Sequence, residues 1–228
     1  MLSFVGVGPG DPELLTLAAL RTLQAADEIA VADSGAGESV VLRIIRNHIA
    51  GKPVSYLRIP MGAREDWAAA HEAAARTLTE KLEKGRRVAY PVLGDPSLYA
   101  SSGYLYRLIA PGHPCEIIPG VPAMCAAAAA LGVPLAEGRE RLTICPGFQA
   151  GEALPEGPVV VMKAGRALSA LREAAAGRPA LAVQNLGMPG QTTGSLGDVG
   201  AQSYFTTVLI RPKSAEESAN PSGSPAAV

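Results

Sequence analysis

Cysteines, aromatic residues and long apolar runs are all scarce in this sequence. Its three cysteines, Cys115, Cys125 and Cys145, show no CxxC spacing and its histidines are isolated, so we expect reduced thiols and no metal site. The longest apolar run, residues 124–131, is far shorter than the roughly 20 residues that a membrane-spanning helix needs. The chain also begins directly with a predicted strand, without the features of a signal peptide. We therefore expect a cytoplasmic protein with no membrane segment.

Net charge is almost absent as well. The chain carries −1 at pH 7 over 228 residues, and its basic residues are scattered rather than gathered in a stripe. Proteins that bind nucleic acid through its phosphates need such a basic face, so we expect no nucleic-acid partner. Hydrophobic residues make up 48% of the chain and aromatic residues 4%. A core of Ala, Val and Leu suits helices packed closely on a sheet.

Apolar strands alternate with helical segments in the first half of the chain. Strands are predicted at residues 2–7, 28–32, 54–59, 88–93 and 116–118, and helices at residues 13–25, 38–47, 66–84, 101–109 and 122–131. This alternation favours a mostly parallel sheet with helices on both faces.

The second half contains more strands and fewer helices. Strands are predicted at residues 141–145, 159–162, 180–184, 192–196 and 204–210, with one helix at residues 167–176. This pattern indicates a mixed sheet. We therefore predict an α/β protein with an N-terminal domain over residues 1–135 and a C-terminal domain over residues 136–211. Residues 212–228 have almost nothing to bury, and we expect a disordered tail there.

Four of the predicted strands end in loops rich in glycine or proline. The strand at residues 88–93 runs into Gly94-Asp95-Pro96, and other such loops begin at residues 6, 119 and 163. Ligands of open α/β sheets lie just beyond the carboxyl ends of the strands, so these loops predict one shared cleft. Taken alone, residues 94–96 are equally well explained as a tight turn without a ligand.

The glycines at residues 6–10 also suggest a dinucleotide site, but the pattern does not fit one. A Rossmann fingerprint needs G-x-G-x-x-G, and position 11 here is Asp11. Pro9 and Pro12 remove two amide donors that a pyrophosphate would use, and Asp11 would repel an anion. The loop is better suited to a neutral or cationic group.

Taken together, the motifs resemble those of the tetrapyrrole (corrin and porphyrin) methylase family, which transfers methyl groups from S-adenosylmethionine. Residues 6–16 (GVGPGDPELLT), 94–96 (GDP) and 119–121 (PGV) match its three motifs in order, and the resemblance extends from residue 2 to about residue 211. The branch that the chain most resembles methylates C20 of precorrin-2 or of cobalt-factor II in cobalamin biosynthesis. The segments that point to this branch are residues 59–61 (IPM), 93–99 (LGDPSLY), 131–138 (LGVPLAEG) and 160–166 (VVMKAGR).

The resemblance implies two α/β domains with the cofactor in the cleft between them, a tetrapyrrole substrate and a homodimer. It places the following residues around S-adenosylmethionine: Gly8, Pro9, Gly10, Leu93, Gly94, Asp95, Leu98, Ser101, Ser102, Pro122, Ala123, Met162, Gln184, Asn185 and Leu186. Many of these contacts are made by the backbone in this family. Two departures from the family pattern stand out, namely Pro122-Ala123 where Ser or Thr is usual, and Pro91 inside a predicted strand.

Methyl transfer from a sulfonium requires positioning and exclusion of water rather than a strong acid. Asp95 is the candidate carboxylate, either near the sulfonium or as acceptor of the proton from the methylated carbon; the alternative is that it only caps its turn. The substrate carries many carboxylates, so we expect contacts from Lys163 and Arg166, with Arg58 and Tyr99 as further candidates. Each of these four can also be an ordinary surface or packing residue.

Several other functions are compatible with the sequence. A sibling methylase acting at another ring position has the same motifs, and a relative that methylates ribosomal RNA is disfavoured by the near-neutral charge. Pro122-Ala123 leaves room for a non-catalytic, cofactor-binding protein, which would bind S-adenosylmethionine without turnover. A dinucleotide oxidoreductase would bind NADH, and Asp11 argues against it.

Overall fold

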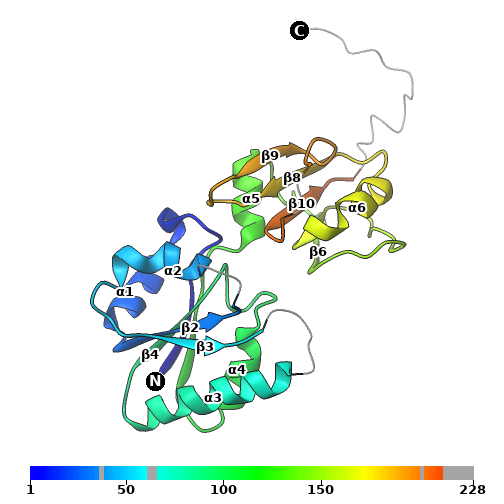
Figure 1. Cartoon of the computed structure of the whole chain (residues 1–228). Coiled ribbons are helices and arrows are strands. Elements are labelled where there is room, and N and C mark those ends of the chain that lie inside the picture. The colour runs from blue at the N-terminus through cyan, green and yellow to red at the C-terminus, as the bar shows by residue number, and fades with distance from the viewer. Residues whose placement is uncertain (36–38, 61–65, 201–202, 213–228) are drawn as a thin grey trace, which may run out of the picture. The chain divides into compact units, whose positions relative to one another are not determined.

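The structure is a computed structural model that describes residues 1–35, 39–60, 66–200 and 203–212 of the chain. It contains two compact units, of which the first is Met1–Ala123 and the second begins at Met124 (Figure 1). The predicted domain boundary lies further along the chain, after residue 135. The predicted disordered tail, apart from Pro212, and Met61 of the segment at 59–61 fall outside the described residues.

The first unit is built on a parallel sheet. Its strands are β1 (Leu2–Gly6), β2 (Glu28–Asp33), β3 (Val54–Arg58), β4 (Val88–Val92) and β5 (Cys115–Ile118). They lie in the order β3-β2-β4-β1-β5, and every neighbouring pair is parallel. The predicted parallel sheet is confirmed. All its strands therefore end at the same edge, which brings their following loops together.

Helices cover both faces of this sheet, as predicted (Figure 1). They are α1 (Leu17–Ala25), α2 (Val40–Ile45), α3 (Trp67–Glu83) and α4 (Ser102–Ile109), with short 3-10 helices at Pro12–Leu14 and Arg46–His48. Successive side chains of a strand point to opposite faces. Leu2 and Phe4 of β1 accordingly pack in one core with α3 and α4. Val5 and the following Val7 pack in the other core with α1 and α2.

Pro91 lies inside β4, the strand at the centre of the sheet. β4 bonds to β1 through Val88, whose amide donates to Met1 at 2.9 Å, and through Val92, whose carbonyl accepts from Val7 at 3.0 Å. Backbone groups of successive residues face alternate neighbours, so position 91 faces β2 instead. Pairing between β4 and β2 ends at Ala89. The proline therefore removes no hydrogen bond from the β1 side, and it stands where β4 has already separated from β2.

The second unit has the predicted mixed sheet. Its strands are β6 (Thr143–Cys145), β7 (Val159–Val161), β8 (Ala180–Gln184), β9 (Thr192–Ser195) and β10 (Thr206–Ile210). They lie in the order β6-β7-β10-β8-β9, and only β6 and β7 run parallel among the described pairs. One face is covered by α6 (Leu168–Ala174), which follows a 3-10 helix at Ala164–Ala167, and the other by α5 (Ala123–Leu131).

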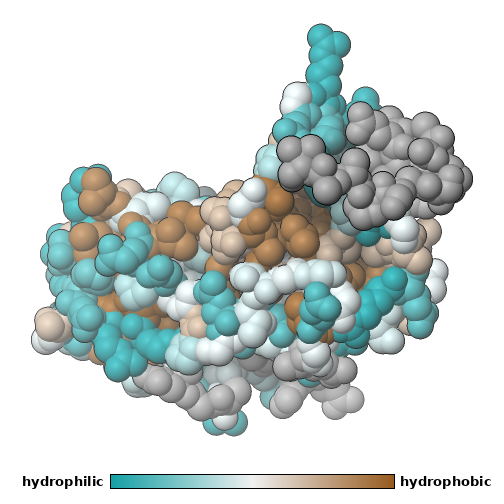
Figure 2. Space-filling model, turned by 90° about the horizontal axis from the view of Figure 1, so that it is seen from above, coloured by the Kyte–Doolittle hydropathy of each residue, from teal (hydrophilic) through white to brown (hydrophobic). Residues whose placement is uncertain are grey.

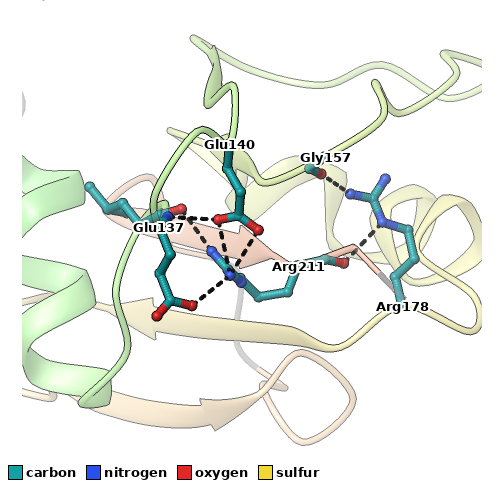
Figure 3. Close-up of polar contacts among 6 residues, drawn as sticks. Glu137, Glu140, Gly157, Arg178 and Arg211 are labelled. Carbon is teal, nitrogen blue, oxygen red and sulfur yellow. Dashed lines mark hydrogen bonds and ion pairs between the residues drawn. The ribbon is translucent and has the colours of Figure 1, made fainter. Parts of the chain in front are cut away.

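Two arginines tie loops of the second unit to the end of β10 (Figure 3). Arg178 donates from Nε to the Arg211 carbonyl at 3.1 Å and from its terminal nitrogen to the Gly157 carbonyl. The Arg211 guanidinium in turn contacts the carboxylates of Glu137 at 3.2 Å and of Glu140 at 3.1 Å. The segment that follows α5 is thus fixed by side chains rather than by strand pairing.

The described surface mixes apolar and polar residues. Figure 2 shows hydrophobic residues reaching the surface among hydrophilic ones on one face of the molecule. Within the described ranges, no helix combines the length and apolar character needed to cross a membrane. The same part of the chain contains no group of three or more His, Cys, Asp or Glu residues placed to hold a metal ion.

Candidate functional site

The first two motifs meet where β1 and β4 end. The Gly94 amide donates to the Gly8 carbonyl at 2.8 Å, and the Gly8 amide donates to the Gly94 carbonyl at 3.3 Å. Both residues have positive φ angles, +75° at Gly8 and +73° at Gly94, a conformation that glycine adopts without strain. The reciprocal bonds hold the loop after β1 against the loop after β4.

The third motif closes on the same junction. A Cβ atom on Gly6 would lie 2.5 Å from the Gly120 amide nitrogen, and one on Gly120 would overlap the Gly94 carbonyl oxygen. Thr16, at the end of the opening motif, donates from Oγ1 to the Pro119 carbonyl at 3.4 Å. Three motifs that are far apart in the sequence therefore interlock. The need for glycine at positions 6 and 120 is explained by backbone packing against backbone, and no ligand is required to explain it.

Asp95 ties the second motif to the third. One carboxylate oxygen accepts from the Ser97 amide at 2.7 Å and the Ser97 hydroxyl at 2.5 Å, and the other accepts from the Gly120 amide at 3.0 Å. Burial by itself would raise the pKa of Asp95, but these three hydrogen bonds outweigh it and lower the pKa. Asp95 is therefore ionised at neutral pH, and the contacts described are those of a loop anchor. Its proposed contact with a sulfonium or a substrate proton stays a prediction.

The opening loop ends in two short helical segments instead of the single helix predicted at residues 13–25. Leu15 and Thr16 are extended, which separates the 3-10 helix from α1. The Asp11 carboxylate accepts from the Glu13 amide at 2.9 Å, and Thr16 Oγ1 accepts from the Ala19 amide at 3.0 Å. Asp11 thus caps the 3-10 helix, and the break frees Thr16 both to start α1 and to reach the third motif.

One polar group near the second motif is left without a partner. Ser102, the first residue of α4, is 2% exposed, and its hydroxyl has no hydrogen-bond partner within the described part of the chain. Leaving a buried hydroxyl unpaired costs about 1–3 kcal/mol. The predicted site residue Ser102 thus has a buried hydroxyl without a described partner, and its contact with a ligand stays a prediction. A Cβ at Gly94 would meet the Ala123 nitrogen at 4.0 Å, so the space beside this buried glycine is less crowded than at Gly6 or Gly120.

The other predicted residues of the first unit are placed as follows. Pro9 and Gly10 are buried, and Leu93, Leu98, Pro122 and Ala123 are half-buried, whereas Ser101 is exposed. Tyr99 is exposed with a φ of 50°. Arg58 ends β3, which β2 separates from β4, so the sheet does not bring Arg58 to the glycine junction.

In the second unit, the predicted residues follow β7 and β8. Met162 is half-buried, and Lys163 and Arg166 are exposed in the loop after β7. Lys163 has a φ of 55°, and its Nζ lies 6.0 Å from the ring centroid of Tyr204. Leu186 is half-buried after β8. Both loops therefore expose groups at the carboxyl ends of their strands.

The side chains of Gln184 and Asn185 are engaged within the unit. Gln184 is buried and donates to Thr206 Oγ1 at 3.0 Å. Asn185 accepts from the Ser203 hydroxyl at 2.7 Å and donates to the Gly190 carbonyl at 3.3 Å. A cofactor contact in this segment would therefore use the backbone, as the resemblance implies. Ser203 was not anticipated, because a serine ahead of a strand belongs to none of the recognised motifs.

Comparisons with known proteins agree with these motifs. The family model of the Tetrapyrrole (Corrin/Porphyrin) Methylases matches residues 1–199. A precorrin-2 C(20)-methyltransferase of Sinorhizobium sp is 35% identical over 187 residues, which cover 75% of this chain and 76% of the relative. A probable cobalt-precorrin-2 C(20)-methyltransferase of Methanocaldococcus jannaschii is 38% identical over 144 residues, which cover 62% of each chain.

The fold has solved counterparts. The crystal structure of a uroporphyrin-III-C-methyltransferase from Thermus thermophilus superposes with a TM-score of 0.71, covering 96% of both chains at 24% identity. At that identity the likeness shows the fold, which is the two-sheet architecture described above.

Proposed function

The chain belongs to the tetrapyrrole (corrin/porphyrin) methylase family, and from this premise we propose that it transfers a methyl group from S-adenosylmethionine to C20 of precorrin-2 or of cobalt-factor II. The observation that supports this ring position is the 35% identity, over three quarters of the chain, to a relative named for that activity. The interlocked loops at the ends of β1, β4 and β5 are where an open α/β sheet places its ligand.

The described residues fit the cofactor. We propose that Gly8, Gly94 and Ala123 border it with backbone atoms, and that the unpartnered Ser102 hydroxyl bonds one of its polar groups. The residues proposed to complete the site are Pro9, Gly10, Leu93, Asp95, Leu98, Ser101, Pro122, Met162, Gln184, Asn185 and Leu186. When bound, S-adenosylmethionine supplies an electrophilic methyl group on a positively charged sulfur.

The task of the protein is then to orient two reactants and keep water away. Good orientation alone is worth about 7–11 kcal/mol of a reaction barrier. The rigid junction of Gly6, Gly94 and Gly120 suits this task because backbone packed on backbone leaves little freedom. We propose that Asp95 acts chiefly as the anchor of this junction. A carboxylate with a lowered pKa and three hydrogen-bond donors is a weak proton acceptor.

The substrate carboxylates need cations. We propose Lys163 and Arg166, exposed in the loop after β7, as their first contacts, with Tyr99 and Arg58 as further candidates. Following the resemblance, we also propose that the enzyme is a cytoplasmic homodimer. Light scattering on the purified chain tests the oligomeric state, and loss of tetrapyrrole binding on charge reversal at Lys163 and Arg166 tests the cations.

An anaerobic methyl-transfer assay tests the proposed function. Labelled S-adenosylmethionine is incubated with metal-free precorrin-2 and with cobalt-factor II in parallel, and the product is analysed for the labelled carbon. We expect a single label at C20 of one substrate. A label at another ring carbon would identify a sibling methylase. Cofactor binding without transfer to either substrate would reject the C20 activity and leave a sibling methylase with another substrate or a non-catalytic binding protein.

A further inference from the structure

Three non-glycine residues in the described ranges have left-handed backbone conformations, namely Tyr99, Lys163 and Asn185. Lys163 and Asn185 belong to the second unit and closely follow β7 and β8, at φ angles of 55° and 50°. Such conformations are strained for most residues other than glycine and persist only where the surroundings hold them. Both occur in loops that carry proposed cofactor residues, so the groups that hold these loops matter for the site.

The sheet topology places one segment beside both loops. β10 lies between β7 and β8 and is antiparallel to each of them. The residues just before β10 therefore lie next to the residues just after β7 and β8. Ser203 is in this segment and is half-buried.

Ser203 contacts the loop after β8 through its side chain. Its hydroxyl donates to Asn185 Oδ1 at 2.7 Å and accepts from the Phe205 amide at 3.2 Å. The Asn185 amide donates to the Phe205 carbonyl at 2.8 Å, which adds a backbone bond to the same junction. The strained residue is thus held on two sides by the segment before β10.

Ser203 contacts the loop after β7 through its backbone. A Cβ atom on Gly165 would lie 2.5 Å from the Ser203 carbonyl carbon and would overlap its carbonyl oxygen. That same oxygen accepts from Thr206 Oγ1 at 2.6 Å, which fixes its direction. The loop containing Lys163 and Gly165 therefore rests directly on Ser203.

We propose that Ser203 is a positioning residue that sets the loops after β7 and β8 for cofactor binding. It acts through Asn185 and Gly165 and does not itself touch the cofactor. The inference rests on the proposed function, because it assigns a purpose to the geometry of residues 184–186 and of Met162. In that role its hydroxyl offsets part of the cost of the left-handed conformation at Asn185.

Isothermal titration with S-adenosylhomocysteine tests the inference. For Ser203→Ala we expect roughly a three- to tenfold weaker Kd, as for loss of one hydrogen bond, and a matching rise in KM for S-adenosylmethionine with a much smaller change in kcat. Ser195→Ala is the matched control, since Ser195 lies on β9 and its side chain accepts only a long bond of 3.3 Å from the Gly197 amide among the described contacts. A Ser203→Ala variant with an unchanged Kd would overturn the inference.

The variant Asn185→Gly distinguishes an effect of Ser203 on the position of the loop from an effect on the general stability of the protein. Asn185→Gly accepts the left-handed conformation without strain, so Ser203→Ala should weaken binding much less in that background than in the natural one. Equal weakening in both backgrounds would show that Ser203 does not act through Asn185, and would overturn the inference.

Hydrogen exchange on the free protein gives a readout that needs no cofactor. We expect amides of residues 184–186 to exchange faster in Ser203→Ala than in the natural protein, and those of residues 163–166 to change less, because that loop packs on the Ser203 backbone, which the variant keeps. Failure of the natural protein to bind the cofactor would reject the proposed function only, and this exchange result would still decide the role of Ser203. Unchanged exchange in residues 184–186 would overturn it.

Discussion

The two units hold the loops at their strand ends by different means. In the first unit, Gly6, Gly94 and Gly120 let backbone pack against backbone, and reciprocal main-chain bonds join the loops. In the second unit, side chains such as Ser203 and Arg211 tie the loops together, and backbone packs on backbone where Gly165 meets Ser203. Where backbone packs on backbone, there is no room for an added atom. Where side chains make the contacts, replacing one side chain removes only the hydrogen bonds of that side chain. Substitution of a glycine at which backbone packs on backbone, such as Gly6 or Gly120, should therefore be far more damaging than substitution of a side chain that ties loops of the second unit, such as Arg211.

Gly120→Ala should have the largest effect. The added Cβ would overlap the Gly94 carbonyl and crowd Gly6, so we expect the free energy of unfolding to fall by about 3 kcal/mol. S-adenosylhomocysteine binding should be lost, because all three motifs must separate to admit the methyl group. Urea denaturation and calorimetric titration measure the two effects.

Gly112→Ala is the control for this variant. A Cβ at Gly112 has no described atom within 4 Å, and Gly112 lacks a positive φ. Its free energy of unfolding should change by less than about 0.5 kcal/mol. If Gly120→Ala were as mild as Gly112→Ala, the backbone junction would not be rigid, and the contrast between the units would disappear.

This contrast explains which parts of the site the sequence predicted. Glycines and prolines that serve a backbone junction must occur at fixed places, so the loops at residues 6–16, 94–96 and 119–121 were visible as motifs. The alternation of strands and helices predicted both sheets for a similar reason, since periodicity follows from which face is buried.

Hydrogen bonds made by side chains leave no comparable pattern in the sequence. Nothing in the sequence links Ser203 to Asn185, because many residue types at many spacings can make one hydrogen bond. The interruption at Leu15 and Thr16 was also missed, since helical periodicity continues through a short break that only the capping contacts reveal. The role of Asp95 was left open between two alternatives, because both need a carboxylate at the same position.

Asp95→Asn tests the anchor that joins two loops of the first unit. At neutral pH, loss of the charged acceptor of three hydrogen bonds should lower the free energy of unfolding by about 2 kcal/mol. The folded-state pKa lies below the unfolded value of about 3.9, so this stability is present above that value and is lost as pH falls through the folded pKa. Stability curves of the natural protein and the variant should therefore converge in that acidic range.

Kinetics of the same variant separate the two roles of Asp95. An anchor predicts weaker cofactor binding with a modest fall in kcat, whereas a proton acceptor predicts a fall of about 100-fold or more in kcat with the Kd preserved. We expect the first result. Asp33→Asn is a suitable control, because the Asp33 carboxylate accepts from one amide among the described contacts, that of Gly35, at 2.8 Å.

Arg211→Gln should have a smaller effect than Gly120→Ala and Asp95→Asn, and it examines the side-chain ties of the second unit. The guanidinium donates to the Leu135 carbonyl at 3.2 Å and pairs with Glu137 and Glu140, whose side chains are 67% and 29% exposed. Partly exposed pairs contribute little, so we expect a loss of about 1 kcal/mol in the free energy of unfolding and an unchanged Kd for S-adenosylhomocysteine.

Arg76→Gln serves as the reference for this loss, since its pair with Glu72 spans 3.9 Å between side chains that are 69% and 61% exposed. That variant should lie within about 0.5 kcal/mol of the natural protein. A loss at Arg211 as large as that of Gly120→Ala would mean that side chains hold the second unit as rigidly as backbone holds the first. The two units would then differ in how visible their junctions are in the sequence, and not in how firmly those junctions are held.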